Sequence, residues 1–266
     1  EEILAVESVK IKQAEKQDDY QEGILLKDVS FSYEGRKEVL YNINIKIEKS
    51  KTTALVGLSG CGKSTIASML MKFIYPSSGT VYLNGIDYAC MNRDEIVKHI
   101  VMVPQTVNLF NDTIRNNLLL ANPSASDEKL WQVLHEVSLD KHIQRMPNGL
   151  DTMVSESGSN LSGGQKQMMG IARALLTDAE YIIFDEATSA VDPESEKIIW
   201  DCIDKLATKR TLIIISHRLS AIRNANQIIV LRAGIVEEIG NHDKLMQNQG
   251  LYRELVEEQN TLEVQA

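Results

Sequence analysis

The chain has 266 residues, of which 43% are hydrophobic and 24% are charged, so it can bury a substantial core in one large or two small domains. No apolar run approaches the roughly 18 residues of a membrane-spanning helix, and the first residues lack the basic start of a signal peptide. Residues 1–22 and 252–266 carry −4 and −3 of the net charge of −9. The near-neutral remainder argues against nucleic acid or an anionic membrane surface as the main partner. The three cysteines lack metal-ligand spacing, which favours a reducing, cytosolic setting.

The first elements are expected to be two antiparallel strands that follow a polar segment. Residues 1–22 are polar and charged without a hydrophobic period, so we expect a linker or tail. Alternating runs then cover 24–31 and 40–47, as in half-buried strands joined by a short polar turn. In the first run, the expected faces are Ile24, Leu26 and Asp28 on one side and Leu25, Val29 and Phe31 on the other.

An apolar strand at 53–56 leads through a glycine-rich turn into a helix-like segment at 66–73. The turn matches the pattern G-x-x-x-x-G-K-[ST], and an ordinary glycine-rich turn is the alternative. Its glycines let backbone N–H groups curl around a phosphate, and the helix N-terminus and a lysine add positive charge. The sequence therefore predicts a nucleoside triphosphate site, with a serine hydroxyl for Mg²⁺. The predicted cradle comprises Gly57, Leu58, Ser59, Gly60, Cys61, Gly62, Lys63, Ser64 and Thr65.

The middle of the chain predicts a sheet with an inserted helical part. A strand at 80–83 precedes Asn84-Gly85, a strong hairpin signal, and a helix at 93–99 precedes a buried strand at 100–103. Residues 106–164 are mostly of helical pattern, and we expect them to form a helical subdomain.

The last third alternates strands and helices. A helix over 161–176 is expected, and Asp192-Pro193 starts another helix, with Asp as N-cap. The remaining expected elements are strands at 181–185 and 212–216, a hairpin at 227–239 and two terminal helices. Together these elements predict an α/β fold with a parallel core and antiparallel strands at one side.

Polar residues at the ends of three predicted strands are candidates for chemistry. Asp185 and Glu186 end a buried strand, where α/β sheets bind ligands, although such a pair also occurs in solvated turns. Asp185 could hold Mg²⁺, and Glu186 could act as general base on a water. His217 ends the next strand and could contact a γ-phosphate, although a lone histidine is usually structural. Gln105 could reach Mg²⁺ or the water, and Tyr33 could stack on a base or simply fill a core position.

A second anion-binding turn opens the helix at 161–176. Ser162, Gly163, Gly164 and Gln165 place a serine and two glycines at a helix N-terminus, without a lysine. One chain thus has two phosphate-binding turns and one set of catalytic groups. A head-to-tail dimer, in which each copy lends this turn to the other's nucleotide, would account for both.

With these motifs, the chain resembles the nucleotide-binding domain of ATP-binding cassette (ABC) transporters over about residues 23–258. The motifs that carry the resemblance occur in the family's order. They are Tyr33 as the aromatic loop, Gly57–Thr65 as Walker A, Gln105 as the Q-loop, Leu161–Gln165 as the signature, Tyr181–Glu186 as Walker B, Ser189–Asp192 as the D-loop and His217 as the switch histidine.

The resemblance implies a P-loop NTPase fold of the RecA type and two such domains that sandwich ATP and Mg²⁺. Ser64, Gln105 and Asp185 would then hold Mg²⁺, and Asp192 would face the nucleotide. The stretch 109–118 and Val154-Ser155-Glu156 resemble the exporter subtype. An exporter's domain would work at the cytoplasmic face of a membrane beside a transmembrane domain, to which 1–22 would lead, and 259–266 would form a C-terminal tail.

Three other functions are alternatives to this interpretation. A soluble ABC ATPase of DNA repair or translation usually carries a second cassette or a coiled-coil insertion, and neither is present in the sequence. A P-loop GTPase or kinase is disfavoured, because the guanine motif N-K-x-D is absent from the sequence and the turn at 161–165 would have no purpose. A non-catalytic nucleotide-binding regulator is disfavoured by Glu186.

Overall fold

The computed structural model describes residues 22–35, 37–155, 158, 160–188 and 191–265. Several expectations lie outside these ranges. They concern nearly all of the linker at 1–22, Glu156 of the exporter-like loop, and Ser189 and Ala190 of the stretch before α7.

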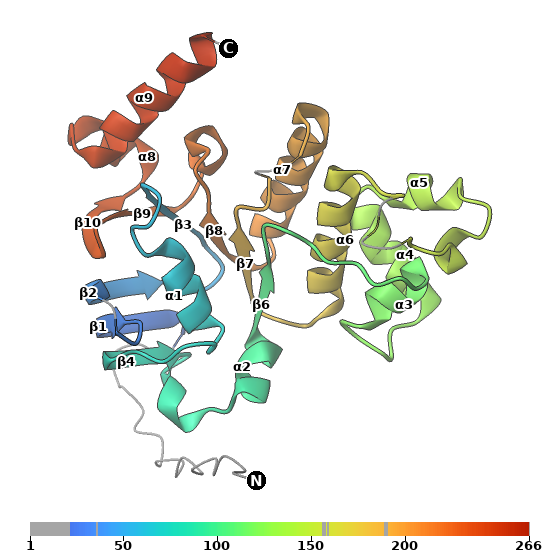
Figure 1. Ribbon diagram of the computed structural model, residues 1–266, viewed down its shortest axis with the longest axis horizontal. Coiled ribbons are helices and arrows are strands. Elements are labelled where there is room, and N and C mark those ends of the chain that lie inside the picture. Colours follow the sequence, from blue (N-terminus) through green and yellow to red (C-terminus); the bar gives the residue numbers. More distant parts are fainter. Residues whose placement is uncertain (1–21, 36, 156–157, 159, 189–190, 266) are drawn as a thin grey trace.

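Two sheets form the body of the molecule, as Figure 1 shows. The smaller is antiparallel with strand order β2-β1-β4-β5, and the larger has the order β10-β9-β3-β8-β7-β6. Within the larger sheet, β9, β3, β8, β7 and β6 run parallel, and β10 is antiparallel to β9. The predicted α/β class with an antiparallel part is confirmed. The strands are β1 Ile24–Ser32, β2 Glu38–Ile47, β3 Thr52–Gly57, β4 Ser78–Leu83, β5 Ile86–Asp87, β6 Ile100–Val103, β7 Tyr181–Asp185, β8 Thr211–Ile215, β9 Gln227–Arg232 and β10 Ile235–Gly240.

The predicted alternation of β1 is wrong after Leu26. Asp28 has φ 52°, and the pairing of β1 with β2 shifts register between Leu26 and Val29. This bulge turns Val29 and Phe31 to the same face as Ile24 and Leu26, and all four are buried. Asp28 lies exposed, with its N–H donating to Asn44 Oδ1.

The six-stranded sheet has a hydrophobic core on each face. On one face, β3 and β8 contribute Leu55 and Ile213 to a core shared with α1 and the antiparallel sheet. On the other face, Val56 and Ile214 pack with α6, α7 and the helical subdomain. Successive strand residues point to opposite faces, so a parallel sheet covered on both sides needs continuous apolar runs. The helices that cover the sheet or flank it are α1 Lys63–Leu70, α2 Arg93–His99, α6 Gly163–Leu176, α7 Pro193–Ala207, α8 His242–Gln247 and α9 Leu251–Gln265.

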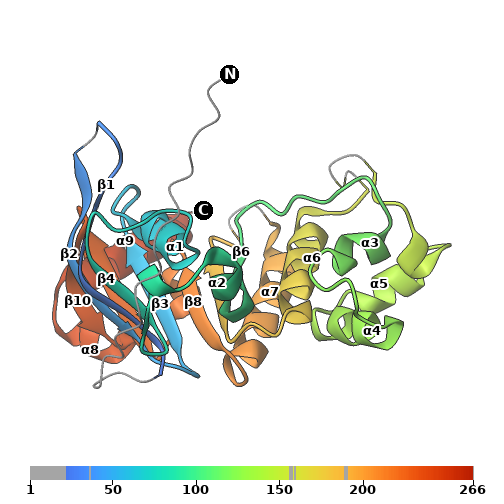
Figure 2. The ribbon, with the colours of Figure 1, turned by 90° about the horizontal axis from the view of Figure 1, so that it is seen from below.

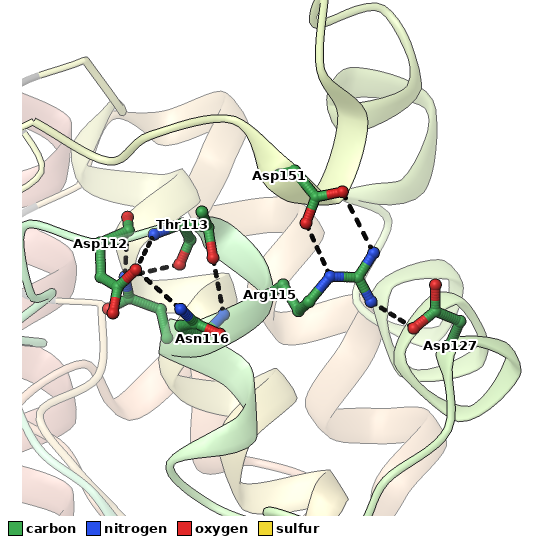
Figure 3. A network of polar contacts seen from close by, with 7 residues as sticks. Asp112, Thr113, Arg115, Asn116, Asp127 and Asp151 are labelled. Atoms are coloured by element: carbon green, nitrogen blue, oxygen red, sulfur yellow. Dashed lines mark hydrogen bonds and ion pairs between the residues drawn. The ribbon is translucent and has the colours of Figure 1, made fainter.

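Residues 106–164 contain α3 Ile114–Leu119, α4 Asp127–Glu136 and α5 Asp140–Gln144. In both ribbon views these helices lie at the opposite end of the molecule from β1, β2 and β10, with α6 and α7 between (Figures 1 and 2). Arg115 of α3 ties this part together, because its guanidinium donates to Asp151 (Nε–Oδ1 2.7 Å) and pairs with Asp127 at the start of α4 (Figure 3). Asp112 and Thr113 cap the start of α3 in the same view.

A buried asparagine links α3 to α6. The Asn117 side chain is fully buried and donates to the carbonyl oxygens of Phe110 (3.0 Å) and Thr113 (2.9 Å). Its Oδ1 accepts from the N–H of Phe110 (2.9 Å) and from Arg173 of α6 (2.7 Å). This side chain therefore holds the segment after Gln105 against α6, the helix that begins at the second glycine turn.

Asn117→Ala is expected to lower the free energy of unfolding by about 3 kcal/mol, because it leaves several buried polar groups without partners. Urea denaturation followed by circular dichroism measures the change. Asn116→Ala is the matched control, since Asn116 is exposed and bonds only Asp112 through its side chain among the contacts described. An equal loss in both variants would contradict the assignment.

The C-terminal helix α9 continues through Gln265 and includes most of the residues expected to form a tail. Asp192 caps α7 as predicted, accepting from the N–H of Ser195 at 2.9 Å, and Pro193 begins the helix. Within the described ranges, no helix combines the length and apolar character needed to cross a membrane.

Candidate functional site

The glycine-rich turn joins β3 to α1 at the carboxyl edge of the parallel sheet. Gly57 has φ 143°, and a Cβ there would lie 2.2 Å from the carbonyl oxygen of Leu231, so only glycine fits. Lys63 is buried, and its ammonium donates to the carbonyl oxygens of Gly57 (2.8 Å) and Leu58 (3.0 Å). Cys61 is also buried, whereas the Leu58 side chain is exposed. The turn thus encloses one buried positive charge.

A cavity of about 280 Å³ lies over this turn and brings together residues far apart in the sequence. We call it the phosphate cavity. It has a polar floor from the turn and an aromatic wall, where the Tyr33 ring packs edge-on against Phe31 and its hydroxyl lies 3.4 Å from Thr65 Oγ1. Val39, at the start of β2, was not predicted, because nothing in an alternating strand marks one apolar residue as a cavity wall. The lining residues are Tyr33, Val39, Ser59, Gly60, Gly62, Lys63, Ser64, Thr65, Glu186 and His217.

Three polar side chains meet where β6, β7 and β8 end. Glu186 Oε1 lies 2.7 Å from His217 Nε2, and Gln105 Nε2 donates to Glu186 Oε2 at 3.4 Å. Glu186 has φ 50°, a conformation that is costly for a residue with a Cβ, and its N–H donates to the carbonyl oxygen of Ile215 in β8. Backbone strain at a polar residue in a cavity is typical of functional sites. The arrangement can orient a water and accept its proton.

Asp185 is half-buried at the end of β7, close to Lys63 and His217. Burial raises the pKa of its carboxyl, and the neighbouring Glu186 charge raises it further, while the Lys63 and His217 charges lower it. The ionised form of this carboxyl is therefore disfavoured in the folded chain, and a cation bound beside it would stabilise that form.

Asp185→Asn is expected to raise the free energy of unfolding at pH 7 in the absence of nucleotide. The folded-state pKa of Asp185 lies above its unfolded value. The protonated carboxyl at low pH therefore does not destabilise the fold, and the ionised carboxylate destabilises it once the pH rises through the folded pKa. The advantage of the variant should therefore shrink as pH falls from 7. Chemical denaturation at several pH values measures it, with the exposed Asp178→Asn as control. A less stable variant at pH 7 would contradict the argument.

The second glycine turn does not reach the phosphate cavity of its own chain. Ser162 Oγ accepts from the N–H of Gln165 (3.2 Å), and Gln165 Oε1 accepts from the N–H of Ser162 (2.9 Å), which caps α6. Ser162 and Gly163 are exposed, and none of these residues lines the phosphate cavity. A Cβ on Gly164 would lie 2.3 Å from Ser195, so glycine there allows α7 to approach α6. Asp192 is likewise absent from the cavity lining.

Comparison with known proteins gives one consistent result. A family model described as "ABC transporter" matches residues 40–189. An ATP-dependent lipid A-core flippase of Vibrio vulnificus is 44% identical over 232 residues, which cover 86% of this chain and 40% of that protein. Multidrug resistance protein pgp-1 of Caenorhabditis elegans is 43% identical over 235 residues, covering 88% of this chain and 18% of that protein.

A solved structure, described as a bacterial Atm1-family ABC exporter with ATP bound, superposes with a TM-score of 0.85 at 36% identity. The match covers 90% of this chain and 42% of that one. The chain thus spans about two fifths of the length of the lipid A-core flippases and of this exporter.

Proposed function

Because this chain belongs to the ABC transporter family, we propose that it is the ATP-hydrolysing domain of an ABC exporter. The observation that carries the proposal is the contact of Gln105, Glu186 and His217 in one polar cluster beside the buried Lys63. The names of the similar proteins favour an exporter over a soluble ABC ATPase.

ATP would bind in the phosphate cavity. The amide groups of the turn, the N-terminus of α1 and Lys63 would hold its phosphates, and the exposed part of the Tyr33 ring would contact the base. The cradle fits a phosphate chain, because the one buried charge in the turn is positive and Lys63, Ser64 and Thr65 line the cavity with polar groups. The set Gly57–Thr65 is the proposed binding loop.

Mg²⁺ is the proposed cofactor, with Ser64, Gln105 and Asp185 as its protein ligands. These residues offer hydroxyl, amide and carboxylate oxygens, the donors that Mg²⁺ prefers, and Asp185 is poised to gain from a cation. The ion would supply neutralisation of phosphate charge.

Glu186 is the proposed general base. Its carboxylate would accept the proton of the attacking water, while His217 fixes one of its oxygens and Gln105 approaches the other. Lys63 would stabilise negative charge on the phosphate oxygens. These roles need no rearrangement of the backbone at Glu186, whose strained conformation already turns the side chain into the cavity.

A second copy of this chain, or a homologous domain, is the proposed partner across the nucleotide. Ser162, Gly163, Gly164 and Gln165 present an exposed helix N-terminus that its own chain does not use in the phosphate cavity. Closure of two copies head to tail would bring this turn, with Asp192, to the partner's ATP.

The dimer would drive a transmembrane domain at the cytoplasmic face of a membrane. Both the lipid A-core flippase and the Atm1-family exporter are more than twice as long as the matched part of this chain. The transported substrate would be selected by that membrane domain and not by the nucleotide site.

A mixing experiment tests the composite site. Lys63→Met removes the phosphate lysine, and Gly163→Asp puts a negative charge at the second turn, so each variant alone should hydrolyse almost no ATP. In a mixed dimer both defects fall into one site and leave the other intact. Mixing equal amounts should therefore restore roughly a quarter of the wild-type rate, since about half of randomly formed dimers are mixed and each has one working site. A mixture as inactive as its parts would exclude the head-to-tail arrangement.

A further inference from the structure

The loop that carries His217 depends on contacts from distant parts of the chain. After β8 it passes through Ser216, His217 and Arg218 into a short 3₁₀ helix, η4 (Leu219–Ile222). Arg218, the N-cap residue of η4, makes no side-chain capping bond. Leu219 is the first residue of η4, so its N–H has no acceptor within the helix, and in a buried residue such a group needs an acceptor from elsewhere.

That acceptor comes from the C-terminal helix. Gln259 Oε1, on α9, accepts from the N–H of Leu219 at 2.8 Å, across 40 residues of sequence. Leu255, one turn earlier on α9, packs against the main hydrophobic core. The position of Gln259 is thus fixed by the packing of α9, and Gln259 transmits that position to the loop.

Two other contacts hold the same loop. Ser216 Oγ accepts from the N–H of Arg218 at 2.9 Å, and the Arg218 guanidinium pairs with Glu196 in the first turn of α7. These contacts fix the residues on either side of His217 toward β8 and α7. Among the polar contacts described, the bond from Gln259 is the one that joins the loop to α9.

The space beside the loop increases the importance of this bond. A cavity of about 420 Å³ is lined by α9, this loop and the glycine-rich turn at 57–65, and Leu58, His217, Leu255 and Gln259 are among its lining residues. The Leu219 side chain packs in the main core, but the side of the loop that faces this cavity is open, so the orientation of residues 216–218 depends on their hydrogen bonds and on that of the Leu219 amide. His217 lies two residues from Leu219, and a shift of the Leu219 amide would move the imidazole relative to Glu186, now 2.7 Å away.

We propose that Gln259 of α9 is a positioning residue for hydrolysis, which holds His217 against Glu186 through the N–H of Leu219. The proposal rests on the proposed ATPase function. It assigns a role to the C-terminal helix, whose residues beyond 258 were expected to be a tail.

Three variants test it in the full chain. Gln259→Met keeps the length of the side chain and removes the acceptor, whereas Gln259→Glu keeps a carboxyl oxygen that can accept. Asn260→Leu changes the next residue, which is exposed on the same helix, and serves as control. The measurements are ATP turnover, ADP affinity by calorimetry, Tm, and hydrogen exchange of the Leu219 and His217 amides without nucleotide.

Gln259→Met is expected to lower kcat about five- to tenfold, the effect of one lost hydrogen bond that orients a reacting group. ADP affinity should stay close to wild type, since Lys63 is untouched, and Tm should fall only slightly, because the cavity beside the loop lets water reach the Leu219 N–H. The Leu219 amide should exchange about tenfold faster. Gln259→Glu should restore slow exchange and most of the turnover, and Asn260→Leu should change neither.

An unchanged kcat in Gln259→Met would overturn the proposal, and so would a parallel loss of kcat, ADP affinity and Tm, which would indicate a purely structural contact. The exchange measurement separates this proposal from the proposed function. If the wild-type chain did not hydrolyse ATP, the ATPase function would fail. Unchanged exchange at Leu219 and His217 in Gln259→Met would instead refute the positioning contact itself, whatever the turnover.

Discussion

Glu186→Gln is expected to lower ATP turnover by about 10²–10⁴-fold while ATP binding is retained, because the change removes a general base and keeps the size of the side chain. The structure motivates this separation. Glu186 contacts His217 and Gln105, whereas the buried charge of the phosphate turn belongs to Lys63. A glutamine can still bond both neighbours, but it cannot take a proton from water at neutral pH.

The measurement is steady-state phosphate release together with ATP affinity from calorimetry. Glu180→Gln is the matched control, because Glu180 immediately precedes β7, at the opposite end of the strand from Glu186, and pairs with Lys49 and His99. That control should keep its turnover. A Glu186→Gln variant that hydrolyses ATP within tenfold of wild type would show that another group accepts the proton.

The same variant should accumulate as a dimer in Mg-ATP. If bound ATP joins two copies through the exposed Ser162 turn, a chain that binds without hydrolysing remains in the closed state. Size-exclusion chromatography with Mg-ATP reads this out directly, with ADP as the comparison. A strictly monomeric Glu186→Gln protein at saturating ATP would contradict the composite site and leave the single-chain chemistry as the only option.

Much of the fold followed from the sequence because the signals are local. The apolar runs of β7 and β8, the N-cap at Asp192 and the hairpin at Asn84-Gly85 each depend on a few neighbouring residues. The bulge at Asp28 did not follow. Its positive φ is accompanied by hydrogen bonds with Asn44 on the paired strand, and this pairing is not visible in the alternation of β1 itself.

The candidate site divides in the same way. Gln105, Glu186 and His217 could be grouped in advance because each follows a predicted strand, and parallel strands end at one edge of the sheet. Val39 in the cavity wall and Gln259 behind the His217 loop could not be grouped. Their positions depend on how β2 and α9 pack against the rest of the chain, and neither residue type indicates a function by itself.

Lys63→Met is expected to weaken ATP binding by about 10- to 100-fold. Lys63 is the one residue that puts a full positive charge inside the phosphate turn, and its ammonium now bonds only groups of that turn among the contacts described, namely the carbonyls of Gly57 and Leu58 and the sulfur of Cys61. Hydrogen bonds to charged groups contribute about 1.5–3 kcal/mol, which corresponds to this range of affinity. Methionine keeps the apolar stem, so the buried packing around residue 63 is largely preserved.

Calorimetry with ATP measures the loss, and circular dichroism checks that the variant is folded. Lys98→Met is the control, because Lys98 is exposed on α2 and its loss changes the net charge equally. Salt separates the two explanations further. If Lys63 contacts ATP inside the buried turn, the variant should bind ATP more weakly than wild type at every ionic strength. If the effect comes from net charge alone, the difference in affinity should disappear as salt screens it. Equal affinities in Lys63→Met and wild type would therefore show that the turn at Gly57–Thr65 does not bind the nucleotide. Glu186 would then have no bound ATP on which to act as general base.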